Sequence, residues 1–391
     1  MRKPQWKRFE EQQQQQEAGI QGGRRPVIGG GQQVIDPGQR VTNAEMIMLG
    51  SNFDTNSIID AIQLWVPPAH WLMDTFFPYD RVSDSDLVQL EYYRLGRMIG
   101  GFVKPEKRGI ARPRKPFQST VYSPPTVKLT RDLDAASLAK RRIGRTQYEG
   151  NNSDGEILAE DTMELINEII NLHEWMCSSL LFTGQLLIED YDDRVLIDTI
   201  TFPGVPQRIN VLPADYWDQP NVNPFRLVKA MQRLVTAAMG DAANIICMGS
   251  DLADAFEENP EVKDQFNKLW IRQGILNPHA LEDEPAVYLL GDYRGVPVYV
   301  NETSYTDRDG VTQPYFPPDT LLVGSTKQAG LMAFAACYQT EPGSNTAEAV
   351  PGKYVPQYWV DHAQDTRRFR MSSRGLPCLH DAQSYVIARA I

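Results

Sequence analysis

Apolar residues recur at helical spacing over one long stretch, between residues 153 and 184. The stretch opens with Ser153-Asp154-Gly155-Glu156, which has the spacing of a capping box, where the serine and glutamate side chains satisfy exposed amide donors. Gly184 follows it, as expected of a residue that tolerates the left-handed conformation after a helix. The pattern predicts a helix over about 154–183, about 43 Å long at a rise of about 1.5 Å per residue. Its apolar positions are Leu158, Leu165, Ile166, Ile169, Leu172, Trp175, Met176 and Leu180.

A different pattern precedes this helix. Apolar and polar residues alternate over 87–93, which predicts a strand. Residues 94–115 then hold eight basic residues, one acid (Glu106) and several glycines, and a second extended stretch follows at 117–130. We interpret these segments together as a long two-stranded excursion that leaves the domain and returns to it.

Beyond the long helix, short strands and helices are mixed. Asn223-Pro224 opens a predicted helix that Gly240 closes, Ser250 is expected to cap a short helix, and Asn259-Pro260 opens another that reaches about residue 270. The pattern has no repeating strand–helix–strand rhythm and no internal repeat, so the predicted class is α+β. The strand-like segments are 185–188, 194–202, 244–248, 287–290, 296–300 and 321–323.

Residues 1–55 read as an N-terminal arm. They contain a run of five glutamines at 12–16, clustered glycines, and few large apolar residues before Met46. Such a segment cannot bury enough apolar surface to fold alone. Two interpretations stay open for residues 1–37: a disordered tail, or an arm that becomes ordered only against neighbouring subunits.

Composition narrows the class of protein. The 391 residues carry a formal net charge of −11, which argues against a dedicated nucleic-acid-binding protein. The four cysteines are scattered, a spacing that favours reduced thiols over a disulfide framework or a zinc site. Residues 1–20 lack the apolar core of a signal peptide, and the longest apolar stretch, 329–338, is far short of a membrane span. We therefore expect a soluble protein with no membrane association.

No motif of catalysis or cofactor binding occurs in the sequence. Glycine-rich phosphate-binding motifs and the nucleophile elbow are absent. His173-Glu174 opens like a zinc-protease motif, but Cys177 stands where the second histidine would be, so a histidine on an amphipathic helix is the favoured interpretation. We expect no catalytic residue, no cofactor and no metal.

Charge is strongly segregated along the chain. Residues 94–148 contain fourteen basic and three acidic side chains, whereas 149–193 contain twelve acidic side chains and no lysine or arginine. Two solvated faces, or an attraction within one chain, would explain this. A third reading is that a basic projection of one subunit lies on the acidic helix region of the next, a head-to-tail contact that closes into rings.

A series of short motifs, in order, resembles the lambda-type major capsid protein family of tailed bacteriophages (major capsid protein E). The motifs cover about 69–325, and no single one is diagnostic. The N-terminal arm and the C-terminal segment beyond 354 match the family pattern poorly. The motifs that carry the resemblance are Trp71-Leu72-Met73-Asp74-Thr75-Phe76-Phe77-Pro78, Gly101-Phe102-Val103, Pro124-Pro125, Glu174-Trp175-Met176, Thr183-Gly184, Trp217-Asp218, Met248-Gly249, Gly295-Val296-Pro297-Val298-Tyr299-Val300 and Asp309-Gly310.

The resemblance implies the Hong Kong 97-type capsid fold. It assigns 1–65 to an N-terminal arm and 66–199 to a peripheral domain, with an extended loop at about 85–130 and a spine helix at about 154–183. It assigns 200–345 to an axial domain and 346–391 to a C-terminal segment that returns to the peripheral domain. With the charge segregation, it singles out as inter-subunit contacts Lys104, Lys107, Arg108, Arg112 and Arg114 of the loop and Glu160, Asp161, Glu164 and Glu168 of the helix.

The function implied by the resemblance is that of a non-enzymatic head protein. Such proteins self-assemble into hexamers and pentamers of an icosahedral shell around double-stranded DNA, in the virion, after assembly in the cytoplasm of a bacterial host. The implied partners are other copies of the chain, a portal, a scaffold, packaged DNA contacted non-specifically, and in some shells a decoration protein. The alternatives are a cellular nanocompartment shell of the same fold, a nucleic-acid-binding module that uses 94–145, and an enzyme of unrecognised type.

Overall fold

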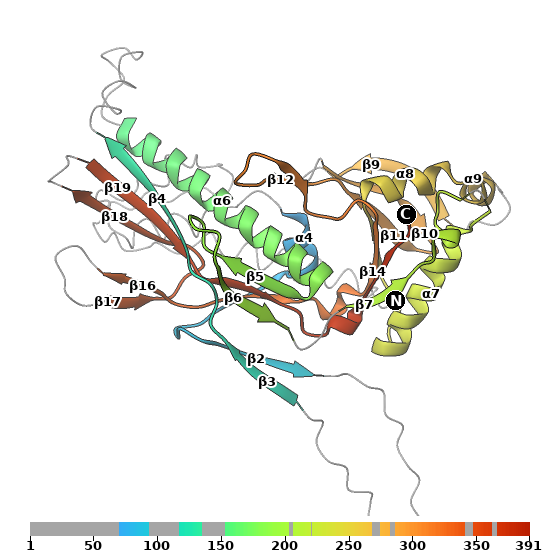
Figure 1. Cartoon of the computed structure of the whole chain (residues 1–391), viewed down its shortest axis with the longest axis horizontal. Coiled ribbons are helices and arrows are strands. Elements are labelled where there is room, and N and C mark those ends of the chain that lie inside the picture. The colour runs from blue at the N-terminus through green and yellow to red at the C-terminus, as the bar shows by residue number, and fades with distance from the viewer. Residues whose placement is uncertain are drawn as a thin grey trace, which may run out of the picture. The chain divides into compact units, whose positions relative to one another are not determined.

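The computed structural model of the protein divides into two units, Met1–Thr42 and Asn43–Ile391. The structure describes residues of the second unit only, so the predicted N-terminal arm lies outside the described residues, as do 94–116 of the predicted extended loop. Figure 1 labels the helices and strands. The described residues are 70–93, 117–134, 153–202, 206–219, 221–267, 274–281, 286–340, 347–361 and 366–391.

The predicted long helix is α6 (Ser153–Thr183), the long green helix of Figure 1. Gly184 has φ 73° and its amide donates to the Leu180 carbonyl oxygen at 3.0 Å, so the glycine ends the helix in the left-handed conformation as predicted. One side of α6 is buried against strand β19 (Thr366–Ser373). The residues of this contact are Leu165, Ile166, Ile169, Ile170, Phe369 and Met371.

Beneath α6 lies a three-stranded antiparallel sheet with the order β18-β19-β4. Its outer strands are β4 (Val127–Asp134) and β18 (Val355–Asp361). Strands from residues 127–134 and 355–373 are therefore neighbours, although more than 200 residues separate them in the sequence.

The second extended stretch, predicted as one segment at 117–130, is in fact two strands in different sheets. β3 (Phe117–Tyr122) pairs with β2 (Val88–Tyr93) in a two-stranded antiparallel hairpin, whereas β4 pairs with β19. Pro124 and Pro125 stand between β3 and β4. Proline has no amide hydrogen to give to a strand ladder, which explains why the chain changes sheets there.

The largest described sheet has seven strands in the order β7-β21-β14-β8-β11-β10-β9. Every residue of its central strands β8 (Ile245–Met248) and β14 (Thr320–Gly324) is buried. β21 (Tyr385–Arg389) lies between β14 and β7 (Gln207–Asn210). The other strands are β9 (Gly274–Ala280), β10 (Val287–Tyr293) and β11 (Val296–Asn301).

Helices α7 (Pro224–Met239), α8 (Ser250–Glu258) and α9 (Pro260–Asn267) pack with this sheet around one apolar core. The predicted ends of α7 are correct: the Asn223 side chain accepts from the Phe225 amide at 3.1 Å, and Gly240 has φ 75°. Core side chains from helices and strands include Val228, Met231, Val235, Leu252, Phe256, Ile246, Val298 and Val323.

The predicted cap of α8 is wrong. Ser250 is the first helical residue, and the N-cap is Gly249, which has no side chain to accept a hydrogen bond. A Cβ atom at Gly249 would lie 2.4 Å from the Pro317 carbonyl oxygen and 2.5 Å from that of Pro318. Glycine occupies this position because the neighbouring backbone leaves no room for any other residue.

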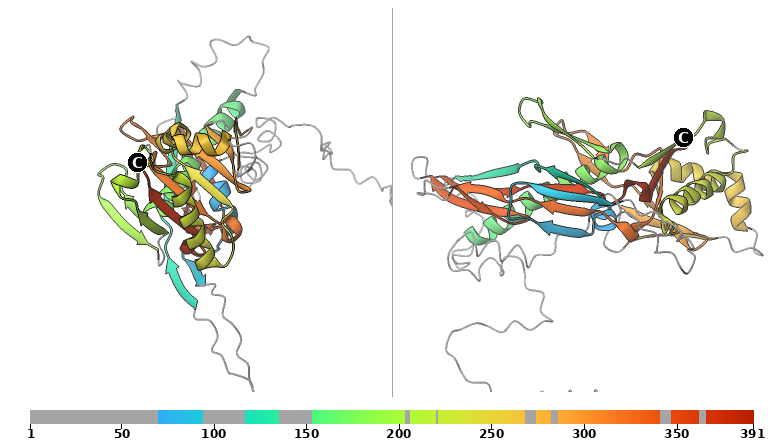
Figure 2. Two further views of the ribbon diagram at one scale, coloured as in Figure 1. Left: turned by 90° about the vertical axis from the view of Figure 1, so that its right-hand side faces the viewer. Right: turned by 90° about the horizontal axis from the view of Figure 1, so that it is seen from below.

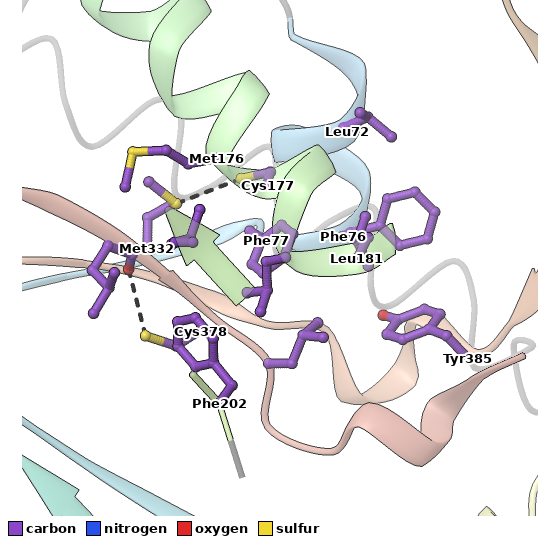
Figure 3. Close-up of a cluster of buried hydrophobic side chains, with 14 of the residues drawn as sticks. Leu72, Phe76, Phe77, Met176, Cys177, Leu181, Phe202, Met332, Cys378 and Tyr385 are labelled. Carbon is purple, nitrogen blue, oxygen red and sulfur yellow. Dashed lines mark hydrogen bonds between the residues drawn. The ribbon is translucent and has the colours of Figure 1, made fainter. Parts of the chain in front are cut away.

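A further core joins the two ends of the described unit. Helix α4 (Trp71–Phe76), the C-terminal half of α6 and the sheet β1-β15-β20 contribute to it. Figure 3 shows Phe76, Phe77, Leu181 and Tyr385 within it, together with the Cys177 thiol, which donates to the Met332 sulfur at 3.8 Å. The strands of that sheet are β1 (Tyr79–Val82), β15 (Leu331–Phe334) and β20 (Gly375–Cys378).

Three small hairpins and three 3-10 turns complete the described elements, which together form the predicted α+β class. In the described part of the chain no helix is both long and apolar enough to cross a membrane. The hairpins are β5 (Gln185–Glu189) with β6 (Leu196–Thr201), β12 (Ser304–Thr306) with β13 (Thr312–Pro314), and β16 (Cys337–Thr340) with β17 (Ala347–Val350). The turns are η2 (Pro213–Asp215), η3 (Thr326–Gln328) and η4 (Ala382–Ser384).

Candidate inter-subunit surface

The structure describes only some of the residues of the inter-subunit contact predicted from charge. All five basic residues of the predicted loop tip fall outside the described residues: Lys104, Lys107, Arg108, Arg112 and Arg114. Glu160 lies in α6, but the structure does not describe its side chain. The acidic residues of the predicted contact whose side chains the structure describes are Asp161, Glu164 and Glu168.

These three carboxylates share one basic partner in their own chain. Arg131 of β4 donates to Asp161 at 2.9 Å and to Glu164, and its other terminal nitrogen lies 3.9 Å from Glu168. Spacings of three and four residues place the three acids on one face of α6, opposite β4. The hydrogen bonds that Arg131 donates to Glu164 and Asp161 raise the pKa of Arg131.

Part of the charge segregation is therefore an attraction within the subunit. Arg131 belongs to the basic stretch and the three acids to the acidic one, so this pairing stabilises the packing of α6 on the β18-β19-β4 sheet. Asp161 is buried, with its side chain 6% exposed, and is unavailable to a neighbour. Glu164 and Glu168 are 62% and 55% exposed and still face solvent.

The root of the β2–β3 hairpin is held by a buried arginine that sequence analysis did not single out. Arg374 follows β19, and its side chain is 7% exposed. Its guanidinium pairs with Asp86 just before β2, and it donates to the Pro124 carbonyl oxygen just after β3 at 3.1 Å. It also donates to the Ser123 hydroxyl at 3.2 Å and to the Ala336 carbonyl oxygen at 3.1 Å. One side chain thus ties both ends of the hairpin to the core.

His173 and Glu174, the start of the zinc-protease-like motif, have structural roles in the fold. Both carboxylate oxygens of Glu174 accept backbone amides of α4, from Leu72 and Met73, each at 2.8 Å. Glu174 therefore satisfies amide donors at the start of that short helix. The His173 ring is buried between Phe334 and Tyr354, and burial lowers its pKa to about 4. No cluster of metal-binding side chains occurs among the residues that the structure describes.

The cysteines are buried free thiols. Burial raises the pKa of Cys177, Cys247 and Cys378, and raises that of Cys337 to about 11. A thiol in such an environment is protonated at neutral pH and is a poor nucleophile.

The family model described as phage major capsid protein E matches residues 54–390. The chain belongs to the phage major capsid protein E family. Two curated relatives are similar over a shorter stretch: the P21 prophage-derived major head protein of Escherichia coli O6:H1 and the major capsid protein of Enterobacteria phage P21. Each is 28% identical over 112 residues, which is 28% of this chain and 32% of the relative. The match thus spans about a third of either relative's length.

Solved structures show the fold of this family member. A crystal structure of a prophage capsid protein from E. coli CFT073 has a TM-score of 0.57 and 16% identity, over 83% of this chain and 94% of that chain. A phage-related protein from Bordetella bronchiseptica RB50 has a TM-score of 0.50 and 11% identity, over 85% and 96% of the two chains. The chain has the Hong Kong 97-type capsid fold, so the family and the fold inferred from the sequence motifs are confirmed.

Proposed function

We propose that this chain is the major capsid protein of a tailed phage and builds an icosahedral head from hexamers and pentamers of itself. The match of the family model over residues 54–390 carries this proposal, and the capsid fold supports it. The role is structural. In the described residues the polar side chains that sequence analysis placed nearest to a catalytic motif, His173 and Glu174, serve packing and helix capping.

The subdivision of the subunit is also a proposal. We assign 1–65 to an arm, 66–199 to a peripheral domain and 200–345 to an axial domain. The strand pairings suggest that the C-terminal segment contributes strands to both domains. β18 and β19 form a sheet with β4, whereas β21 pairs with β7 and β14 in the seven-stranded sheet. The segment 346–391 would then connect the two domains in addition to returning to the first.

The partners follow from that role. Other copies of the chain form the shell, a portal and a scaffold act in assembly, a decoration protein binds in some shells, and double-stranded DNA fills the interior in the virion. Assembly takes place in the host cytoplasm. A net charge of −11 suits a wall that must hold dense DNA without binding it tightly.

We further propose that the basic loop of one subunit, with Lys104, Lys107, Arg108, Arg112 and Arg114, docks on the acidic region 149–193 of its neighbour. On α6 itself, Glu164 and Glu168 are the described carboxylates that are exposed enough to take part. Because both are close to Arg131, a lysine at either position would repel that arginine within its own subunit.

Electron microscopy of the overexpressed full-length chain tests the main proposal. Closed shells or tubes are expected. A chain that stays monomeric or forms only small oligomers, at concentrations where capsid proteins assemble, would contradict it. The nucleic-acid-binding alternative predicts that the isolated subunit binds DNA with a steep dependence on salt, whereas a shell subunit should bind DNA weakly at all salt concentrations.

A further inference from the structure

The β5–β6 hairpin presents apolar side chains to solvent. At its base Leu186 and Ile200 are buried in the core. Towards its tip five large apolar side chains are between 50% and 75% exposed, more than in any other described stretch of similar length. Several large exposed apolar side chains gathered on one small element of a folded protein are typical of an interaction site. The exposed residues are Leu187, Tyr191, Val195, Leu196 and Ile197.

The tip of this hairpin is held in place by a second hairpin. Arg308, in the β12–β13 turn, donates to the carbonyl oxygens of Asp190 and Tyr191 at 3.1 Å each and pairs with Glu189 at 3.3 Å. Arg194 pairs with Asp309 of the same turn. The two hairpins project side by side in the right-hand view of Figure 2. A surface fixed in this way loses little conformational entropy when a partner binds.

The hairpin surface is also acidic. Residues 185–201 contain five carboxylates and one arginine. Glu189 is paired with Arg308, but among the described residues no cation lies within 4 Å of the side chains of Asp190, Asp192, Asp193 or Asp198. A partner must therefore bring apolar groups and positive charge together.

We infer that the β5–β6 hairpin, supported by the β12–β13 turn, is the docking surface for residues 94–116 of a second copy of this chain. That segment has the complementary composition. It contains eight basic residues and one acid, interleaved with Leu95, Met98, Ile99, Phe102, Val103 and Ile110. Apolar side chains would cover the exposed hairpin residues while the basic side chains meet the carboxylates around them. This inference rests on the proposed shell function and locates its inter-subunit contact.

The alternative acceptor on α6 is less suited to the same segment. Arg131 already lies against Asp161, Glu164 and Glu168, and that face of the helix packs on the subunit's own β4. A second cation arriving there would compete with Arg131. At the hairpin tip, by contrast, no cation of the described residues pairs with Asp192 or Asp193, and the exposed Tyr191 and Val195 are close to them in the sequence.

Zero-length cross-linking of assembled wild-type shells tests the inference without altering the protein. Carbodiimide joins a lysine amine to a carboxylate only where the two are in contact. Shells would be assembled from an equal mixture of ¹⁴N-labelled and ¹⁵N-labelled subunits, and the cross-linked peptides identified by mass spectrometry. We expect Lys104, Lys107 or Lys115 joined to residues 189–198, with half of these peptides carrying one light and one heavy partner.

Each other outcome overturns the inference. Cross-links from these lysines to Glu160, Glu164 or Glu168 would place the contact on α6. Peptides of uniform label would show that the loop folds onto its own subunit. A hairpin without cross-links in complete shells would be free for a different partner. In these three cases the shell proposal survives, whereas failure of the wild-type chain to form shells would refute both.

A pair of variants gives a second test. The double variant Asp192→Lys with Asp193→Lys should reduce shell yield about tenfold at low salt, where attraction is least screened. The matched control is Glu257→Lys with Glu258→Lys, an equal change of charge at the exposed end of α8. Normal assembly of the hairpin variant, or an equal loss in the control, would contradict the inference. Circular dichroism of both unassembled variants establishes that the subunit still folds.

Discussion

Replacing Arg374 with methionine should release the root of the β2–β3 hairpin while leaving most of the subunit folded. Methionine keeps the apolar packing of the arginine stem but donates no hydrogen bond. The change leaves the Pro124 and Ala336 carbonyl oxygens without the donor that Arg374 supplies, and removes the ionic partner of Asp86.

The size of the stability loss in Arg374→Met follows from the burial of the groups that lose their partner. Each buried acceptor left without a donor costs about 1–3 kcal/mol. Asp86 is 44% exposed and regains water, so the loss of its ion pair adds only up to about 1 kcal/mol. Some of this cost is offset because a charged guanidinium no longer has to be desolvated. We expect a net loss of about 3 kcal/mol, concentrated at the hairpin root.

Hydrogen exchange of the unassembled subunit is the assay, because it reports the free energy of local opening strand by strand. Amides of β2 and β3 should exchange about a hundredfold faster in the variant, which corresponds to about 2.7 kcal/mol. Exchange in β8 and β14 should change little. Arg374→Lys keeps the charge but not the branched set of donors and should fall between the variant and the wild type.

The matched control is Arg389→Met. Arg389 also pairs with a carboxylate, Asp319 at 3.5 Å, but its side chain is 74% exposed. Its loss should change no exchange rate by more than about fivefold, since exposed pairs contribute less than about 1 kcal/mol. If β2 and β3 exchange at the wild-type rate in Arg374→Met, the arginine does not hold the hairpin and our reasoning is wrong.

Three further predictions concern stability. Histidine in the unfolded chain has a pKa near 6.5, whereas folded His173 has a pKa of about 4, so the unfolded state binds the proton first. The free energy of unfolding should therefore fall by roughly 3 kcal/mol as the pH drops from 6.5 to 4. Urea titrations at a series of pH values should show that His173→Leu flattens this pH dependence, and an unchanged dependence would contradict the prediction. In the same titrations Gly249→Ala should lower the free energy of unfolding by about 2 kcal/mol, because the alanine Cβ would overlap two backbone carbonyls. The control Gly352→Ala should lower it far less, because the atom nearest to a Cβ there would be a valine methyl group, at 3.1 Å, and not a backbone atom. Arg131→Met should lower the free energy of unfolding by about 1–2 kcal/mol, because buried Asp161 loses its partner. Adding Asp161→Asn to this variant should recover part of the loss. If the losses of the two single variants simply add in the double variant, the residues do not interact.

Local patterns in the sequence predicted local structure well. The capping box and Gly184 located α6 to within about one residue, and Asn223-Pro224 with Gly240 located α7, because these ends are determined by neighbouring residues. Family motifs supplied the fold. At 117–130 the alternation indicated strand correctly, but no local pattern indicates which sheet a strand joins, and there the prediction of one continuous segment failed.

Contacts between distant residues could not be predicted in the same way. Arg374 pairs with Asp86, 288 residues earlier in the chain, and nothing near either residue in the sequence indicates the other. Arg131 was counted in the basic stretch, yet its role depends on the packing of β4 beside α6. Charge totals therefore indicated that the two stretches attract each other, but they did not distinguish an attraction within one subunit from one between subunits.

The position of β21 has a consequence for folding during synthesis. This strand, at residues 385–389, separates β7 from β14, and β19 at 366–373 is the middle strand of the other main sheet. Neither sheet can be completed while these residues are still inside the ribosome. Both must then close through contacts of very long sequence separation, which makes closure slow. An interrupted translation product would lack β21, so β7 would have no partner in the seven-stranded sheet, and such incomplete chains should be degraded before they can enter a growing lattice.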